Sequence, residues 1–140
     1  MADDVLINKA ATIERCVARA REEYAFDTAS FATDFTRQDA AILNIQRACE
    51  AALDIGQHLI RREKLGVPQS ARDVFTLLAQ GGWINVTLAD NLKRMVGFRN
   101  IAVHDYQALQ HAITVSIITT HLHEFLDYSQ AVLLRDAVTK

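Results

Sequence analysis

Residues 36–66 read TRQDAAILNIQRACEAALDIGQHLIRREKLG, and their apolar spacing indicates one long amphipathic helix. Thr36 and Asp39 stand three residues apart, as in a capping box with Asp in place of the usual Glu, and predict where the helix starts. Gly66 and Pro68 predict its end, because Gly suits the position after a helix and Pro cannot continue one. The apolar and small residues of the predicted face are Ile42, Ile45, Cys49, Leu53, Gly56 and Leu59 or Ile60.

Helical periodicity extends outward from this segment in both directions. We expect further helices over 3–26, 71–80, 86–97 and 108–136, with Ser70 capping the second of these. With short connections between them, these segments predict an all-α, up-and-down bundle of four or five helices. The last helix is expected to be continuous and about 29 residues long.

Composition agrees with a helical globular protein. The chain has 140 residues, of which 50% are hydrophobic and 23% charged, and a chain of this length predicts a single domain over 1–140. Only 1 Pro and 5 Gly occur, too few for a many-stranded β protein. The acidic N-terminus lacks the pattern of a signal peptide, and no apolar run approaches 18 residues, so we expect a cytoplasmic protein. Cys16 and Cys49 are expected to be buried free thiols.

Charge is unevenly distributed along the chain. The formal net charge of −2 argues against a simple basic nucleic-acid coat. Residues 1–60, however, carry 6 basic and 10 acidic side chains, whereas residues 61–111 carry 7 basic and 4 acidic ones, a net charge of +3. The middle third of the chain is therefore the part expected to attract a phosphate backbone.

The segment GFRNIAVHDY, residues 97–106, lies in this basic third and concentrates groups suited to phosphate chemistry. Arg99 offers a planar fork of donors that can hold a phosphate, and His104 can accept or donate a proton near neutral pH. Asn100 and Tyr106 can hydrogen-bond a phosphate or orient the imidazole. Gly97 is expected to end or loosen the preceding helix.

Two interpretations of this cluster follow from its spacing. On one continuous helix Arg99 and His104 would lie about 140° apart. They would meet at one site only if the helix breaks between them or if a second subunit contributes, as in a two-fold dimer with a small basic cleft. In the other interpretation Arg99 pairs with Asp105 or another carboxylate, and the remaining side chains simply pack at a helix junction.

Several other kinds of site are excluded by the absence of their motifs. No GxxxxGK[ST], GxGxxG, HExxH or Glu-x-x-His pattern occurs. His121 and His123 are two residues apart and would face nearly opposite sides of a helix, so they cannot share a metal ion. We therefore expect neither a metal site nor a cofactor.

The spacing R-x4-H-x-Y, formed by Arg99, His104 and Tyr106, resembles the signature of HEPN-domain toxins, specifically the HepT-like ribonucleases of bacterial toxin–antitoxin pairs. The likeness extends over about 36–125 and includes the run HLIRREKLGVPQSARDVFTLLAQGGWI that precedes the motif. The resemblance implies a HEPN-like, homodimeric, metal-independent endoribonuclease. It implies that Arg99 and His104 are the catalytic pair, supported by Asn100 and Tyr106.

The resemblance also implies a partner. In this family the antitoxin is similar to a minimal nucleotidyltransferase of the MntA type, which is thought to transfer AMP from ATP to the motif tyrosine, here Tyr106. Added negative charge and bulk at a phosphate-binding cleft would repel RNA. The alternative functions are a non-catalytic HEPN subunit that binds a nucleotidyltransferase, and a plain helical dimerisation module. Arg47, Glu50 and Asp54 on the long helix either contribute to the cleft or are ordinary solvated residues.

Overall fold

The computed structural model describes residues 3–139 and confirms the all-α prediction. No strand occurs within this range. A short 3₁₀ turn, η1 (Tyr106–Ala108), follows the fourth helix, and a π-helical turn, η2 (Ile117–His121), joins the last two. The α-helices are α1 (Asp4–Ala25), α2 (Phe35–Glu63), α3 (Ala71–Gln80), α4 (Val86–His104), α5 (His111–Ser116) and α6 (His123–Thr139).

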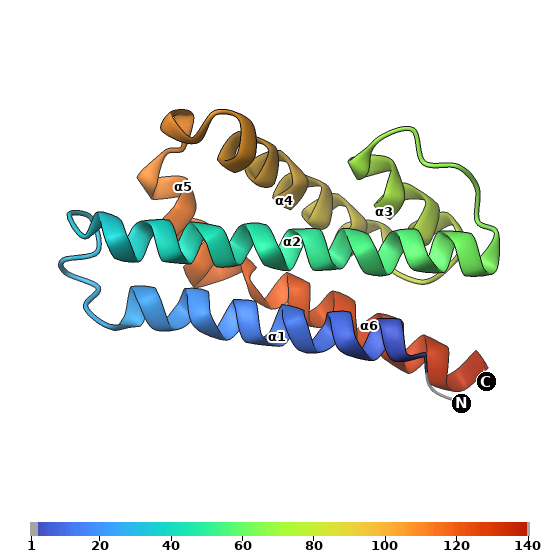
Figure 1. Cartoon of the computed structure of the whole chain (residues 1–140). Coiled ribbons are helices and arrows are strands. Elements are labelled where there is room, and N and C mark those ends of the chain that lie inside the picture. Colours follow the sequence, from blue (N-terminus) through green and yellow to red (C-terminus); the bar gives the residue numbers. More distant parts are fainter. Residues whose placement is uncertain (1–2, 140) are drawn as a thin grey trace.

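Helix α2 is the centre of the bundle, because it contacts α1, α3, α4 and α6. Figure 1 shows α1 running antiparallel beside α2, with α3 and α4 along another side of α2. The segments at the two ends of the chain lie at the same end of the molecule as α3, whereas η1 and α5 lie at the opposite end (Figure 1). No described helix is both long enough and apolar enough to cross a lipid bilayer.

The core is continuous and aromatic at its centre. Tyr128 of α6 is fully buried, stacks edge-to-face on Phe75 and donates a hydrogen bond to the carbonyl of Ala52 at 2.8 Å. Burying a large side chain of this kind stabilises the fold by about 2 kcal/mol. As predicted, Cys16 and Cys49 are free, buried thiols.

Both predicted boundaries of the long helix need correction. Helix α2 begins at Phe35, and the side chain that caps it is Asp34, which accepts the Arg37 N–H, so Thr36 and Asp39 do not form a capping box. At the other end the helix stops at Glu63 and its left-handed cap is Lys64, with φ 54°, two residues before Gly66, whose φ of 133° is also positive. In contrast, Ser70 caps α3 as predicted, accepting the Asp73 N–H at 3.2 Å.

The predicted continuous helix over 108–136 is wrong. Leu109 is extended, which separates η1 from α5, and the π turn η2 then separates α5 from α6. Threonine hydroxyls bond back to the main chain here: Thr119 to the Val115 carbonyl at 2.8 Å and Thr120 to the Ser116 carbonyl at 2.6 Å. Such bonds compete with regular helical pairing and bend helices.

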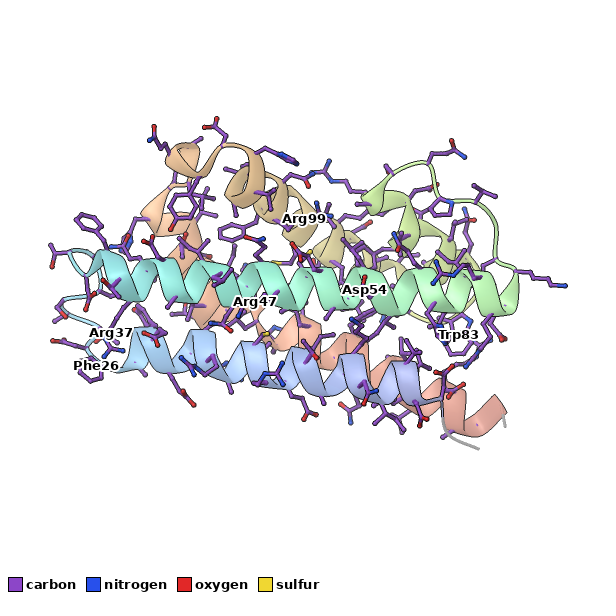
Figure 2. The ribbon with its side chains drawn as sticks, viewed as in Figure 1. Phe26, Arg37, Arg47, Asp54, Trp83 and Arg99 are labelled. Atoms are coloured by element: carbon purple, nitrogen blue, oxygen red, sulfur yellow. The ribbon has the colours of Figure 1, made fainter. Side chains whose placement is uncertain are left out.

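An ion network ties together the end of the molecule that holds both chain termini; we call this region the terminal end. Arg62 of α2 donates to Asp3 and to Asp136, each at 2.8 Å, and His58 hydrogen-bonds Asp3 at 2.7 Å. The Arg62 guanidinium carbon lies 5.6 Å from the ring centre of Trp83, which is labelled in Figure 2. Burial alone would raise the pKa of Asp3, but the hydrogen bonds from His58 and Arg62 outweigh it and lower that pKa to about 2.

Candidate active site

Helix α4 carries most of the motif residues on one unbroken helix. Its N-terminus is capped by Asn85, which accepts the Leu88 N–H at 2.7 Å, and it continues through Gly97 to His104. The prediction that Gly97 ends the helix is therefore wrong. A Cβ at this position would lie 2.8 Å from Nη2 of Arg72, so glycine here makes room for an arginine that reaches across from α3.

Arg99 points from α4 toward α2 and is half-buried (Figure 2). Burial raises the pKa of the Cys49 thiol on α2 to about 12, while the charge and hydrogen bonding of the adjacent Arg99 guanidinium act in the opposite direction. The Nε of Arg99 is buried and has no hydrogen-bond partner among the described residues. The alternative in which Arg99 pairs with Asp105 is therefore not what the structure shows, and the guanidinium retains an unused donor.

His104 is the last residue of α4, and its side chain is exposed. The chain then leaves the helix at Asp105, whose N–H still donates to the Ile101 carbonyl at 2.8 Å. Arg99 and His104 thus stay on one continuous helix, about 140° and 7.5 Å apart around and along its axis. Within one copy of the chain they do not face the same point.

Tyr106 opens η1 and reaches back to the start of α2. Its hydroxyl donates a hydrogen bond to Oδ1 of Asp39, 67 residues away in the sequence. Burial and the Asp39 carboxylate together raise the pKa of Tyr106 to about 12. Tyr106 as a whole residue is 43% exposed, so the side chain remains reachable from solvent. A hollow of about 310 Å³ opens beside this pair, and His111 and Thr114 form its far wall.

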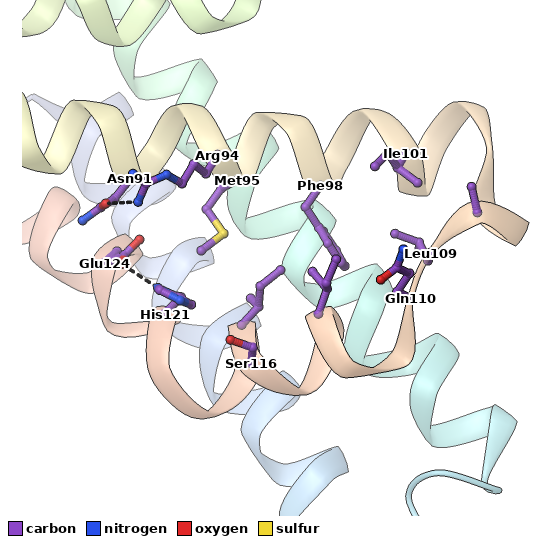
Figure 3. A pocket seen from close by; sticks show the side chains of 13 residues that line it. Asn91, Arg94, Met95, Phe98, Ile101, Leu109, Gln110, Ser116, His121 and Glu124 are labelled. Carbon is purple, nitrogen blue, oxygen red and sulfur yellow. Dashed lines mark hydrogen bonds and ion pairs between the residues drawn. The ribbon is translucent and has the colours of Figure 1, made fainter.

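A second cavity lies directly beside α4. It has a volume of about 320 Å³ and lies between α4 and the α5–η2 segment, with Phe98 and Ile113 among its apolar walls (Figure 3). Glu124 stands at one end and is 5% exposed. One of its oxygens pairs with His121 at 2.9 Å, and the other is buried with no partner in the described part of the chain.

The three α2 residues that the sequence offered as possible contributors to the cleft lie apart from the motif residues. Arg47, Glu50 and Asp54 border a shallow hollow between α1 and α2, where Asp54 pairs with Lys9 at 3.0 Å. All three are exposed, and this contact belongs to the α1–α2 packing. His121 and His123 have separate carboxylate partners, Glu124 and Asp127. No group of three or more metal-ligating side chains occurs within 3–139.

Three residues of the site were missed at the sequence level. Asp39 was interpreted as a capping residue, although its carboxylate binds Tyr106. Cys49 beside Arg99 and Glu124 in the second cavity carried no local signal, because each meets its partner only through packing between helices. For Asp39 a signal did exist: Asp34 is the better-placed cap of α2, which leaves Asp39 free for another role.

Comparison with known proteins places the chain in a family. A family model described as Ribonuclease HepT-like matches residues 13–132. The chain is also 54% identical over 123 residues to the mRNA nuclease HepT of Shewanella oneidensis, covering 88% of this chain and 92% of that relative. The chain belongs to the HepT-like ribonuclease family. The family predicted from Arg99, His104 and Tyr106 is therefore confirmed.

Solved structures of HepT-like toxins agree closely with this fold. A toxin–antitoxin complex with AMP-PNP matches with a TM-score of 0.89 and 51% identity, covering 93% of this chain and 98% of that one. A tri-AMPylated HEPN toxin of S. oneidensis in complex with an MNT antitoxin matches with a TM-score of 0.89 and 52% identity, covering 93% and 97%. These structures share the helical architecture across nearly the whole HepT-like chain.

Proposed function

We propose that this chain is the toxin of a bacterial toxin–antitoxin pair and that it cleaves RNA in the cytoplasm without a metal ion. The observation that carries the proposal is a half-buried Arg99 that pairs with no described carboxylate, on the same helix as an exposed His104, within a chain of the HepT-like ribonuclease family. A cation that pairs with no described carboxylate is available to a phosphate.

RNA cleavage without a metal needs three actions. A base removes the 2′-hydroxyl proton, an acid protonates the leaving oxygen, and a cation stabilises the charge that develops on phosphorus. One histidine cannot be base and acid in the same instant. Since α4 does not break between Arg99 and His104, we propose that a second copy of the chain completes the cleft, so that two histidines and two arginines share it.

The other two motif residues have supporting roles in this proposal. Asn100 is half-buried on α4 next to Arg99 and would hydrogen-bond the substrate phosphate or orient the imidazole. We further propose that Tyr106 accepts AMP from an MntA-like nucleotidyltransferase antitoxin. The matched S. oneidensis toxin is itself tri-AMPylated and bound to an MNT antitoxin, and the Tyr106 ring here is accessible to such a partner. Each added phosphodiester would repel RNA from the cleft.

Cleavage of RNA by the purified protein in EDTA tests this proposal. Arg99→Ala and His104→Ala should each lower the cleavage rate by about a hundredfold or more. His123→Ala is the matched control for the histidine, because it is also exposed and pairs only locally with Asp127. Arg19→Ala, which replaces an exposed arginine of α1 that pairs locally with Glu22, is the control for the arginine.

The following results would each contradict a part of this proposal. If His104→Ala cleaves RNA as fast as the unaltered protein, His104 is not a catalytic residue. If the unaltered protein itself cleaves no RNA, the non-catalytic partner is the better description. If sedimentation shows a monomer at concentrations where cleavage is complete, the shared cleft is wrong even though the nuclease stands. Loss of cleavage in EDTA alone would contradict the metal-independent chemistry.

A further inference from the structure

The Tyr106 hydroxyl is hydrogen-bonded to the Asp39 carboxylate of α2. Among the described residues, no other motif side chain is bound to a carboxylate of α2. Asp39 lies in the second turn of α2, and the N-terminus of that helix is already capped by Asp34. Capping therefore does not occupy the Asp39 carboxylate. Instead, Oδ1 of Asp39 accepts a hydrogen bond from the Tyr106 hydroxyl. In the proposed AMP transfer this hydroxyl is the attacking group.

The surroundings of the pair leave room for a reactant. The hollow beside it, about 310 Å³, is bounded by Gln38 and Phe35 of α2, by Gln107 of η1 and by His111 of α5. Among the residues that line this hollow Asp39 is the one carboxylate, and His111 is the one other titratable group apart from Tyr106. Phe35 is 71% exposed, so the hollow is open to solvent on the α2 side.

We propose that Asp39 positions Tyr106 and accepts its proton during nucleotide transfer, an inference that rests on the proposed function. The phenolic oxygen of Tyr106 attacks the α-phosphorus of ATP, held by the antitoxin. An O–P bond forms, the bond between the α-phosphorus and the pyrophosphate oxygen breaks, and pyrophosphate leaves. The phenolic proton passes to the Asp39 carboxylate and from there to water, which restores the ionised carboxylate.

An acceptor hydroxyl next to an aspartate is how protein kinases orient their substrate, where the aspartate takes the hydroxyl proton as phosphoryl transfer proceeds. The same need exists here. With a pKa of about 12, Tyr106 is a neutral phenol near pH 7 and loses its proton only as the new O–P bond forms. Asp39 already occupies the position from which it can take that proton.

The geometry restricts this role to the first AMP. Once Tyr106 is modified, its phenolic oxygen carries no proton and can accept no further phosphorus. A toxin that carries three AMP groups, as the S. oneidensis relative does, must therefore attach the later ones to other hydroxyls. Asp39 should control how fast a molecule becomes modified, and not how many AMP groups a modified molecule then gains.

The test is a time course of intact-protein mass with ATP and an MntA-type antitoxin nucleotidyltransferase. We expect Asp39→Asn to slow the first transfer about a hundredfold at saturating ATP, with the KM for ATP and for the toxin unchanged. The proportion of higher adducts among modified molecules should stay the same. Asp39→Glu, which keeps a carboxylate, should recover at least tenfold of the lost rate.

Asp127→Asn on α6 is the matched control, since it removes the same charge from an exposed carboxylate that pairs with His123. If Asp39→Asn is modified as fast as the unaltered toxin, the antitoxin supplies the base and the inference is wrong. A rise in KM for the toxin with an unchanged maximal rate would make Asp39 a docking residue and would also overturn it. If Asp39→Asn fails to fold, Asp39→Glu decides alone: an unchanged first-transfer rate supports a carboxylate base, and a rate reduced as far as in Tyr106→Phe contradicts it.

Tyr106→Phe separates this inference from the proposed function. If that variant still gains AMP, the acceptor assignment fails, and Asp39 loses its role with it. If Tyr106→Phe stays unmodified while Asp39→Asn reacts normally, only the role of Asp39 is refuted.

Discussion

The two ends of the bundle use their arginines in opposite ways. At the terminal end Arg62 donates to Asp3, Glu63 and Asp136. At the motif end, the region of α4 and η1 that holds Arg99, His104 and Tyr106, the Arg99 Nε is buried with no partner among the described residues. A donor satisfied within the fold contributes to stability, whereas an unsatisfied one is a cost that a ligand can relieve. Stability and activity should therefore respond to different substitutions.

The largest loss of stability is expected where α2 meets α3, toward the terminal end. A Cβ on Gly56 would lie 2.3 Å from Cγ1 of Val74, a stiff β-branched side chain. Gly56→Ala should lower the free energy of unfolding by about 2 kcal/mol, measured by urea denaturation. Gly97→Ala is the matched control at the motif end. There the new Cβ meets only the flexible tip of Arg72, so stability should stay within about 1 kcal/mol of the original. Equal losses would refute the contrast.

Removing the bridging arginine should cost slightly less. Arg62→Met keeps much of the chain length but takes the guanidinium away from two carboxylates, that of the partly buried Asp3 and that of the buried Asp136. We expect a loss of about 1.5 kcal/mol in the free energy of unfolding at neutral pH, moderated because the side chain is 24% exposed. RNA cleavage per folded molecule should be unchanged. A nuclease defect without a change in stability would show that the terminal end takes part in function.

Acid should weaken the terminal end selectively. Hydrogen bonds outweigh burial and lower the pKa of Asp3 from 3.8 to about 2. The ionised carboxylate therefore stabilises the fold fully at any pH above the unfolded-state pKa. This contribution is lost as the pH falls from about 4 to about 2. Asp3→Asn should thus be less stable than the original by about 1 kcal/mol at neutral pH, and this gap should close as the pH approaches 2. Thermal melts over pH 2–7 check this; a gap that widens in acid would contradict it.

The smallest effect is expected from the motif tyrosine. Tyr106→Phe removes one exposed hydrogen bond to Asp39 and should change the free energy of unfolding by less than about 0.5 kcal/mol. Tyr128→Phe is the control, because its hydroxyl is buried and its loss should cost about 1 kcal/mol. If the two substitutions destabilise the fold equally, the Asp39–Tyr106 contact serves the architecture rather than modification.

Much of the fold and part of the site could be predicted from the sequence. The spacing of apolar residues predicts α1, and the same spacing together with the capping hydroxyl of Ser70 predicts α3. The end of α4 could not be inferred, because Gly97 lies inside the helix beside an arginine from another helix, a contact that the local sequence does not reveal. The π turn was hidden for a similar reason: an apolar stripe does not reveal that one helical turn contains an extra residue.

For the site, residue types were a better guide than geometry. R-x4-H-x-Y identified the family and drew attention to Arg99, His104 and Tyr106. It gave no hint that Arg99 packs beside Cys49, or that Tyr106 is bound by Asp39. Those contacts connect residues 50 and 67 positions apart, and no spacing rule reaches that far.

The π turn η2 makes the motif end sensitive to chain length. Regular α-helix turns by about 100° per residue, so deleting one residue from Ile117–His121 would restore regular pairing and rotate α5 by that angle relative to α6. Ile113 would then leave the cavity beside α4, and His111 would leave the hollow beside Tyr106. The shapes of both hollows thus depend on a single residue of length, so insertions and deletions in η2 should be tolerated far less well than substitutions there.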